Sequence, residues 1–361
     1  MKLHKLFFKS NGAPRPWVKR ILFDKHLRLK EQWRRVVFDS SGDIRKVFSD
    51  WYSLVLHNPD PAIDPGWRAH RDDLLKSRPF VERKIITVVS PNATLYVARM
   101  LGWYLSRFNL QAELVTEMPQ HFGDGLYIVI CPQIYKRLPP REQRIFFQME
   151  QSVSSRWFSQ EYLNIMYNSL AVFDYSLKNI QFLESQRPGQ YRLYHVSVEP
   201  VPLSALLTGH STPAVNYPAR QGIVFYGDPK SPRRQKFLGE LTKHFQVDVV
   251  QGLYGEALWR KLSQAKLVVN IHYYEDALLE TTRISECLCL GLSVVSEESS
   301  DQREQQTFHS KVLFTPVGDI DAMIHAISRQ LVKPLEPSLS IQNDSSSAAG
   351  LKHALQSLEI L

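Results

Sequence analysis

Cysteine is scarce in this chain of 361 residues, which contains only Cys131, Cys287 and Cys289. A small, odd number of cysteines on apolar segments argues against a disulfide framework and favours a reducing compartment. Cys287 and Cys289 form a C-x-C pair with no second pair and no neighbouring histidines, so a structural zinc site is not expected.

Long apolar runs are also missing. No stretch reaches about 18 apolar residues, so a membrane-spanning helix is not expected. The first ten residues, MKLHKLFFKS, contain neither a long apolar region nor a small-residue cleavage site, which argues against a signal peptide. The content of 43% apolar and 22% charged residues is typical of a soluble globular protein. We therefore expect a cytoplasmic protein with two domains.

The positive charge is unevenly distributed. The first fifty residues hold thirteen Lys and Arg against five Asp and Glu, a difference of +8 that equals the net charge of the whole chain. Together with Phe7, Phe8, Trp17 and Phe23, this charge predicts peripheral contact with the anionic inner face of a membrane. Packing of the segment on the neighbouring domain is the alternative. Nucleic acid is not an expected partner, because no recognition motif accompanies the charge.

Two series of short apolar runs alternate with amphipathic segments. Apolar spacing over 17–37 predicts a helix in the basic arm. Strand–helix–strand units follow, and they are typical of parallel α/β sheets. In the first series we expect strands over 85–89, 112–115, 126–130, 145–149, 170–173 and 193–196, with helices over 93–108 and 177–186. In the second series we expect strands over 222–226, 247–250, 267–271, 293–296 and 311–314, with helices over 235–244, 256–265, 283–290 and 320–332.

This alternation predicts the fold class α/β, with two Rossmann-like domains facing across a cleft after a basic N-terminal extension. The expected boundaries are 1–80 for the extension, 81–203 for the first domain, 204–221 for a linker, 222–335 for the second domain and 336–361 for the tail. The tail is rich in serine, and we expect it to be partly mobile and to include a terminal helix.

Polar residues follow the strand that ends at Asn270. In open parallel sheets, ligands bind beyond the carboxyl ends of the strands. The sequence Glu280-Thr281-Thr282-Arg283 predicts a helix start there, and free N–H groups at a helix start favour a diphosphate. The two threonine hydroxyls and the bidentate guanidinium of Arg283 add donors to the same site.

Further candidates surround this helix start. Glu286 lies about one turn after the helix start, and its carboxylate can accept both hydroxyls of a ribose. Lys230 and Arg233 are candidates to neutralise the diphosphate, with a solvated helix start as the alternative. Asp228 and His272 are candidate catalytic groups that would face the anomeric carbon. A turn residue and a structural histidine, respectively, are the alternatives.

The pattern E-x-x-R-I-x-E-x-L-x-x-G-x-x-V-V-S-E, from Glu280 to Glu297, resembles the donor-site signature of GT-B-fold glycosyltransferases. The segments FYGDPKSPRR at 225–234 and VLFTPVGD at 312–319 are also similar to that family. The resemblance implies a nucleotide-sugar bound in the second domain, with Glu286 as its ribose-binding glutamate. It also implies transfer of the sugar to a glycan or a lipid-linked acceptor, with a role in the synthesis of cell-surface polysaccharide.

Two features depart from the family signature. Retaining members often have two glutamates separated by seven residues, whereas five residues separate Glu280 and Glu286. Ser90-Pro91-Asn92 also stands where a glycine-rich loop is usual. The sugar, the nucleotide base and the stereochemical course therefore stay open.

The first domain is expected to bind the acceptor. Glu150 follows a strand and is the leading candidate for the general base, with a helix-terminal glutamate as the alternative. Asn92 and Asp174 are candidate acceptor-binding residues, although Asp174 is also a candidate helix cap. No D-x-D-type metal pair is evident where a nucleotide-sugar would need it, so side-chain cations would stabilise the leaving group, and neither a metal nor a cofactor is expected.

Two other classes of protein are alternatives to this interpretation. A non-catalytic nucleotide- or sugar-binding module would carry the same donor site, and it would differ in whether Glu150, Asp228 and His272 converge on one cleft. A nicotinamide-dependent oxidoreductase would need G-x-G-x-x-G after an early strand. Neither 85–89 nor 222–226 is followed by that motif.

Overall fold

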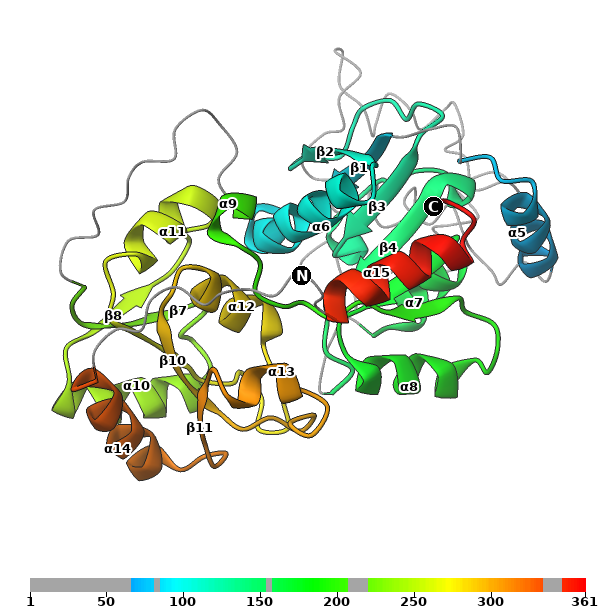
Figure 1. Cartoon of the computed structure of the whole chain (residues 1–361). Coiled ribbons are helices and arrows are strands. Elements are labelled where there is room, and N and C mark those ends of the chain that lie inside the picture. Colours follow the sequence, from blue (N-terminus) through cyan, green and yellow to red (C-terminus); the bar gives the residue numbers. More distant parts are fainter. Residues whose placement is uncertain (1–65, 81–84, 154–157, 207–219, 334–345) are drawn as a thin grey trace, which may run out of the picture. The chain divides into compact units, whose positions relative to one another are not determined.

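The computed structural model describes residues 66–80, 85–153, 158–206, 220–333 and 346–361 (Figure 1). One compact unit contains Asp64–Gln133 and Leu138–Leu361, and it includes both sheets. A second unit groups Met1–Ile63 with Ile134–Arg137. The basic arm, the helix expected at 17–37 and most of the expected linker lie outside the described residues.

The first sheet has six parallel strands in the order β2-β1-β3-β4-β5-β6. Its central strands are buried along their whole length because helices cover the sheet, which explains their nearly continuous apolar sequences. The strands are β1 (Ile85–Val89), β2 (Gln111–Val115), β3 (Leu126–Ile130), β4 (Arg144–Gln148), β5 (Ala171–Asp174) and β6 (Leu193–His195).

One helix of this half begins at a side-chain cap. The Oγ of Ser159 accepts a hydrogen bond from Tyr162 N at 3.2 Å and so caps α7. The α-helices are α5 (Trp67–Lys76), α6 (Leu95–Arg107), α7 (Gln160–Tyr167), α8 (Leu177–Gln186) and α9 (Leu203–Leu206). The 3-10 helices are η1 (Asn92–Thr94), η2 (Pro132–Ile134) and η3 (Arg141–Gln143).

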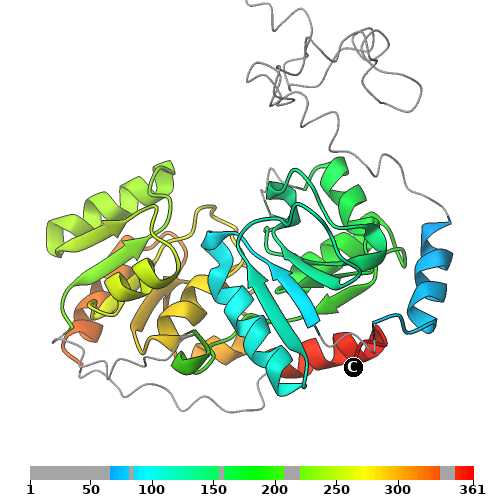
Figure 2. The same ribbon diagram turned by 90° about the horizontal axis from the view of Figure 1, so that it is seen from above.

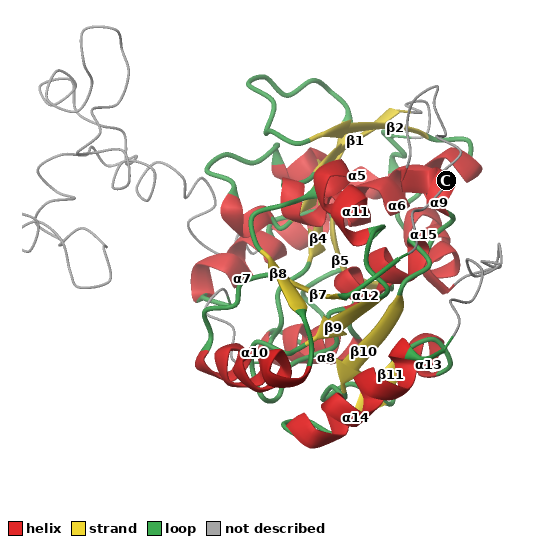
Figure 3. Cartoon of the chain, turned by 90° about the vertical axis from the view of Figure 1, so that its left-hand side faces the viewer, coloured by secondary structure: helices red, strands yellow, loops and turns green. Residues whose placement is uncertain are grey.

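The second sheet has five parallel strands in the order β11-β10-β9-β7-β8. The strands are β7 (Ile223–Tyr226), β8 (Val247–Val250), β9 (Leu267–Asn270), β10 (Ser293–Glu297) and β11 (Leu313–Thr315). The helices are α10 (Pro232–His244), α11 (Gly255–Leu262), α12 (Thr281–Cys289), α13 (Gln306–His309), α14 (Ile320–Leu331) and α15 (Ser346–Ser357). Figure 3 distinguishes the helices from the strands by colour.

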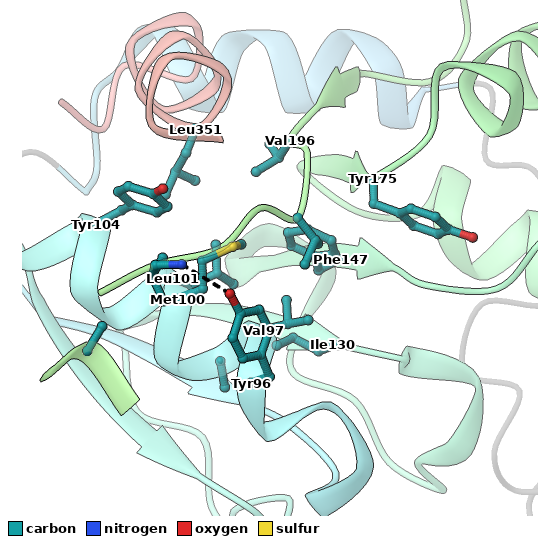
Figure 4. Packing of buried hydrophobic residues seen from close by; sticks show 14 of the residues in the cluster. Tyr96, Val97, Met100, Leu101, Tyr104, Ile130, Phe147, Tyr175, Val196 and Leu351 are labelled. Atoms are coloured by element: carbon teal, nitrogen blue, oxygen red, sulfur yellow. Dashed lines mark hydrogen bonds between the residues drawn. The ribbon is translucent and has the colours of Figure 1, made fainter. Parts of the chain in front are cut away.

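The larger hydrophobic core surrounds α6. Tyr96, Met100, Leu101 and Tyr104 of this helix are buried, and they face residues from β3, β4 and α15 (Figure 4). The hydroxyl of Tyr96 donates to the carbonyl oxygen of Glu199 at 2.7 Å and accepts from the Val201 N–H at 3.2 Å. Burying each of these large side chains contributes about 1.5–3 kcal/mol to folding.

The last helix, α15, packs against β6 of the first sheet although it follows the second sheet in the sequence (Figures 1 and 2). A Cβ atom at Gly350 would lie 2.5 Å from the carbonyl oxygen of His195, so this close approach requires glycine. Leu351, Ala354 and Leu355 of α15 are buried in the larger core.

The expected α/β fold class with two parallel sheets is confirmed. Helix starts differ by a few residues: α10, capped by Ser231, begins at Pro232, three residues before the start expected at 235. The helix α5, in the segment expected to be an extension, buries Trp67, whose Nε1 donates to Tyr167 O at 3.0 Å. Among the described residues, no helix is long and apolar enough to cross a membrane.

Hydrogen bonds join the two halves of this unit. Gln151, after β4, bonds to the backbone of Leu278, before α12. The Oγ of Ser176, after β5, donates to Oδ2 of the buried Asp301 at 3.3 Å. The cleft expected between the two domains stays a prediction.

Candidate functional site

The site is built at the carboxyl edge of the second sheet. The parallel strands β7, β9 and β10 end at Tyr226, Asn270 and Glu297, so the loops that follow them emerge at the same edge. A pocket of about 500 Å³ lined by Ile223 and Lys261 lies at the opposite edge, where β7 and β8 begin, and it is separate from this site.

Glu280 lies at the centre of the site, immediately before α12. Its Oε2 accepts hydrogen bonds from His272 Nδ1 at 2.5 Å and from Asn270 Nδ2 at 3.0 Å. Its Oε1 lies 3.4 Å from Arg234 Nη2 and 3.7 Å from Arg283 Nη1. Burial alone would raise the pKa of Glu280, but the charges of His272, Arg283 and Arg234 hold that pKa well below its ordinary value.

His272 is fully buried beneath Glu280. Its Nδ1 bonds to the Glu280 carboxylate and its Nε2 lies 3.0 Å from the carbonyl oxygen of Glu298. Both partners are acceptors, so the doubly protonated ring satisfies both bonds. Burial opposes the charged ring, yet Glu280 and then Glu297 raise the pKa of His272 above its ordinary value.

The catalytic role expected for His272 stays a prediction. Neither ring nitrogen is available to a ligand, and the side chain has no exposed surface. Through its Nδ1 the ring orients the carboxylate of Glu280, which is what the alternative, a structural histidine, would do.

Arg234 and Arg283 converge on this carboxylate. Arg234 is buried, and it donates from Nε to Ile271 O and from Nη1 to Asp228 O, both at 2.9 Å. Burial, and then the charge of Arg283, lower the pKa of Arg234 to about 10, so it remains protonated at neutral pH. Arg283 donates from Nη1 to Asn270 Oδ1 at 2.7 Å.

Gly227 makes room for the two guanidinium groups. Its φ of +129° is a backbone conformation that favours glycine. A Cβ atom there would lie 2.8 Å from Nη2 of Arg283 and 3.6 Å from Nη1 of Arg234. The loop after β7 and the start of α12 therefore meet at this glycine.

The first turn of α12 offers unused donors. Thr281 Oγ1 and Arg283 Nε are buried and have no hydrogen-bond partner among the described residues. The N–H of Thr281 donates to Leu279 O at 2.8 Å, and the start of a helix adds a partial positive charge. Thr282, half-buried, completes the segment expected to bind a diphosphate. These donors and the two nearby cations form a site suited to an anion.

Glu286 lies in the second turn of α12 and is 7% exposed. Its Oε1 accepts from Trp259 Nε1 at 2.6 Å, and its Oε2 accepts from the Tyr226 hydroxyl at 2.8 Å. Burial raises the pKa of Glu286, although both hydrogen bonds favour the ionised form. The carboxylate expected to meet a ribose is thus held by two aromatic donors.

The remaining candidates after β7 are Arg233, Lys230 and Asp228, and their surroundings differ from those of Arg234. Arg233 forms a bidentate ion pair with the buried Glu297 and donates from Nη1 to His272 O at 3.2 Å, so its guanidinium is not directed at Glu280. Lys230 and Asp228 are exposed. The Oδ1 of Asp228 accepts from Lys230 N at 3.0 Å, which is the turn-stabilising bond considered as its alternative role.

Two of the first-domain candidates are fixed by neighbouring side chains. The Oε1 of Glu150, half-buried, accepts from Gln133 Nε2 at 2.8 Å. Asp174 is fully buried, accepting from Gln148 Nε2 at 2.6 Å and Ser176 N at 2.8 Å, and burial raises its pKa to about 8. Both oxygens of this carboxylate are bonded within the protein, and the acceptor-binding role expected for Asp174 stays a prediction.

Asn92, the other acceptor-binding candidate, is exposed in η1. It follows β1 at the carboxyl edge of the first sheet, where ligands of such sheets bind. The structure therefore leaves its predicted role open.

Several residues of the site were missed from the sequence. Asn270 links Glu280 to Arg283, and Tyr226 and Trp259 hold Glu286. Asn270 carried a signal, because a polar residue ends an apolar strand at the ligand-binding edge. Trp259 carried none, since it reads as an apolar residue of an amphipathic helix.

Metal ligands do not gather in the described part of the chain: no group of three or more His, Cys, Asp or Glu side chains there is arranged to hold an ion. The expectation that neither a metal nor a cofactor takes part stays a prediction.

No family model matches this chain, and no curated protein matches it. Among solved structures it is similar to sucrose-phosphate synthase from Thermosynechococcus elongatus, with 14% identity, coverage of 77% of this chain and 97% of that one, and a TM-score of 0.44. It is also similar to Anabaena HepE in complex with UDP and glucose, with 14% identity, coverage of 76% and 94%, and a TM-score of 0.41.

A third similar structure is a glycosyltransferase from Rickettsia africae, with 9% identity, coverage of 76% of this chain and 93% of that one, and a TM-score of 0.36. These neighbours are of the GT-B class that the sequence resembles. At TM-scores below 0.5 the likeness does not define an activity, so the function has to be argued from the residues of the site.

Proposed function

We propose that this chain is a glycosyltransferase whose nucleotide-sugar donor binds at the carboxyl edge of the second sheet. The convergence of Arg234 and Arg283 on the start of α12 carries the proposal. Arg234 and Arg283 place two positive charges beside the first turn of α12, and both lie within 4 Å of the Glu280 carboxylate. A diphosphate is the ligand that matches this charge and the unpartnered donors beside it.

The ribose would lie against Glu286. A carboxylate offers about four acceptor positions, of which Tyr226 and Trp259 use two. The remaining positions can accept two vicinal hydroxyl groups. Glu286 follows Arg283 by three residues, so one side of the helix would contact both the diphosphate and the ribose.

In the proposed reaction, the bond between the anomeric carbon and the diphosphate oxygen breaks and a bond to an acceptor hydroxyl oxygen forms. The acceptor proton passes to a base, for which Glu150 is the leading candidate and Asp228 the second. Arg283 Nε and Thr281 Oγ1 would stabilise the charge that develops on the leaving diphosphate, without a metal ion.

The proposed acceptor is a glycan or a lipid-linked saccharide, and the proposed role is the synthesis of cell-surface polysaccharide. The basic, aromatic first fifty residues support contact with an anionic membrane, where lipid-linked acceptors lie. Flotation with phosphatidylglycerol vesicles compares the full chain with one lacking residues 1–50. Equal flotation of the two would contradict the membrane contact.

The hydrogen bonds at both ring nitrogens of His272 favour a second function, a non-catalytic nucleotide-binding module, because they engage one of the three catalytic candidates. The two functions differ in turnover. A transferase releases free nucleotide when both a nucleotide-sugar and an acceptor are present, whereas a binding module holds the nucleotide-sugar unchanged.

Calorimetry with UDP, GDP, CMP, dTDP and ADP tests the donor site. We expect one nucleotide to bind, and we expect Arg283→Gln to weaken that binding at least tenfold, or by about 1.4 kcal/mol. Arg329→Gln, a change in an exposed arginine of α14, is the matched control. The proposal fails if no nucleotide binds or if the two variants bind equally. Turnover in the presence and absence of EDTA then tests the metal-independent transfer.

A further inference from the structure

The loop that leads into α12 is buried, and its backbone groups are bonded within the protein. The carbonyl oxygen of Ala277 accepts from Ser300 N at 2.9 Å. The N–H of Leu279 donates to Asp301 Oδ1 at 2.9 Å, and its carbonyl accepts from Thr281 N at 2.8 Å. Because these groups are shielded from water, each depends on a protein partner.

The middle residue of this loop, Leu278, is bonded by a side chain from the other half of the unit. Gln151 Nε2 donates to Leu278 O at 3.2 Å, and Leu278 N donates to Gln151 Oε1 at 2.9 Å. One side-chain amide therefore satisfies both backbone groups of a fully buried residue. Gln151 follows β4 at the carboxyl edge of the first sheet.

The backbone of the two residues next to Gln151 in the chain is held by Asn179. Asn179 Oδ1 accepts from Ser152 N at 2.8 Å, and Asn179 Nδ2 donates to Glu150 O at 2.8 Å. The same amide donates to Oδ1 of the buried Asp174 at 3.1 Å. The backbone on both sides of Gln151 is thereby fixed to the end of β5.

A second connection runs from Asp174 to the same loop. Ser176 N donates to Asp174 Oδ1 at 2.8 Å, and Ser176 Oγ donates to Asp301 Oδ2 at 3.3 Å. The other oxygen of Asp301 holds Leu279 N. Two hydrogen-bonded routes thus leave Asp174 and end at adjacent residues, immediately before Glu280.

We infer that Gln151 is a positioning residue through which the first sheet sets the conformation of 278–283, and with it the affinity of the donor site. The inference rests on the proposed function for the identity of the ligand. Its structural half, the effect of Gln151 on the conformation of 278–283, does not depend on that function. Without the amide of Gln151, the backbone N–H and carbonyl of Leu278 lose both partners. The start of α12, with its unpartnered donors, would then be less ordered.

Hydrogen exchange followed by mass spectrometry tests the structural half, and calorimetry with UDP, GDP, CMP, dTDP and ADP tests the effect on affinity. The variant Gln151→Leu removes both bonds, and Gln151→Glu keeps only the acceptor for Leu278 N. Thr307→Val is the control: it removes a different 3.2 Å bond between the halves, to Glu199, and touches neither Leu278 nor Asp301.

We expect Gln151→Leu to speed amide exchange over 278–283 at least tenfold and to weaken nucleotide binding at least tenfold. Gln151→Glu should give smaller changes in the same direction, and Thr307→Val should give neither change. Exchange or affinity that is the same in Gln151→Leu and Thr307→Val would overturn the inference. If the unaltered protein binds none of the nucleotides, the proposed function fails, and the exchange rates still decide the structural half.

Discussion

Trp259 donates its indole N–H to Glu286 at 2.6 Å, and the two residues lie 27 positions apart on α11 and α12. The tyrosine that ends β7 holds the other oxygen of the same carboxylate. Glu286 is therefore oriented from two elements before any ligand arrives. Because the Glu286 carboxylate is already oriented, its side chain loses little conformational freedom when a ligand binds.

Trp259→Phe should destabilise the fold by about 1.5–3 kcal/mol, because it leaves a buried carboxylate without one of its two donors. Urea unfolding at neutral pH measures the change. Trp67→Phe is the matched control, since Trp67 Nε1 donates to the uncharged carbonyl of Tyr167. Equal losses in the two variants would show that the charge of Glu286 contributes nothing to this bond.

Gly227→Ala should weaken nucleotide binding several-fold and should lower stability by about 1 kcal/mol or more. The positive φ at this position disfavours alanine, and the new Cβ would displace the end of Arg283. Calorimetry and thermal unfolding measure the two effects. Gly239→Ala, in α10 where a Cβ meets nothing within 4 Å, should stabilise the helix by about 0.5–1 kcal/mol and leave binding unchanged.

Stability should depend on pH through the pair formed by His272 and Glu280. The raised pKa of His272 means that its contribution is present below its ordinary pKa of 6.5 and is lost as the pH rises through the folded-state value. The lowered pKa of Glu280 means that its contribution is present above 4.5 and is lost in stronger acid. Unfolding free energy should therefore fall as the pH rises above about 6.5.

The variant His272→Gln isolates this effect, because glutamine does not titrate. Denaturant unfolding at several pH values between 6 and 9 should show a smaller decline for the variant than for the unaltered protein. Parallel curves would mean that His272 is not charged in the folded state.

The strands were the most predictable part of the fold. The expected strands 85–89, 126–130 and 247–250 match β1, β3 and β8. Apolar and β-branched residues over four or five positions are a local signal, and turn residues end it on both sides. Helix starts were less predictable, because Pro232 and the capping Ser231 of α10 read as part of a loop.

The choice between adjacent arginines could not be made from the sequence. Arg233 and Arg234 differ by about 100° around α10, so one pairs with Glu297 and the other reaches Glu280. Glu297 ends β10 and Glu280 lies after β9, so both acids come near only through the sheet order. The burial of His272 and Asp174 was unpredictable for the same reason, because their hydrogen-bond partners include residues that are distant in the sequence.

The amino-acid sequence by itself determined the α/β class, the two series of strands and the polar loop before α12, since each depends on residues close together in the chain. Only the tertiary structure decided which arginine meets Glu280, that two aromatic donors hold Glu286, and that Gln151 bonds to Leu278. The last two residues are 127 positions apart. Hydrogen bonds between such residues depend on strand order and helix packing, and a pattern of hydrophobicity along the chain does not contain either.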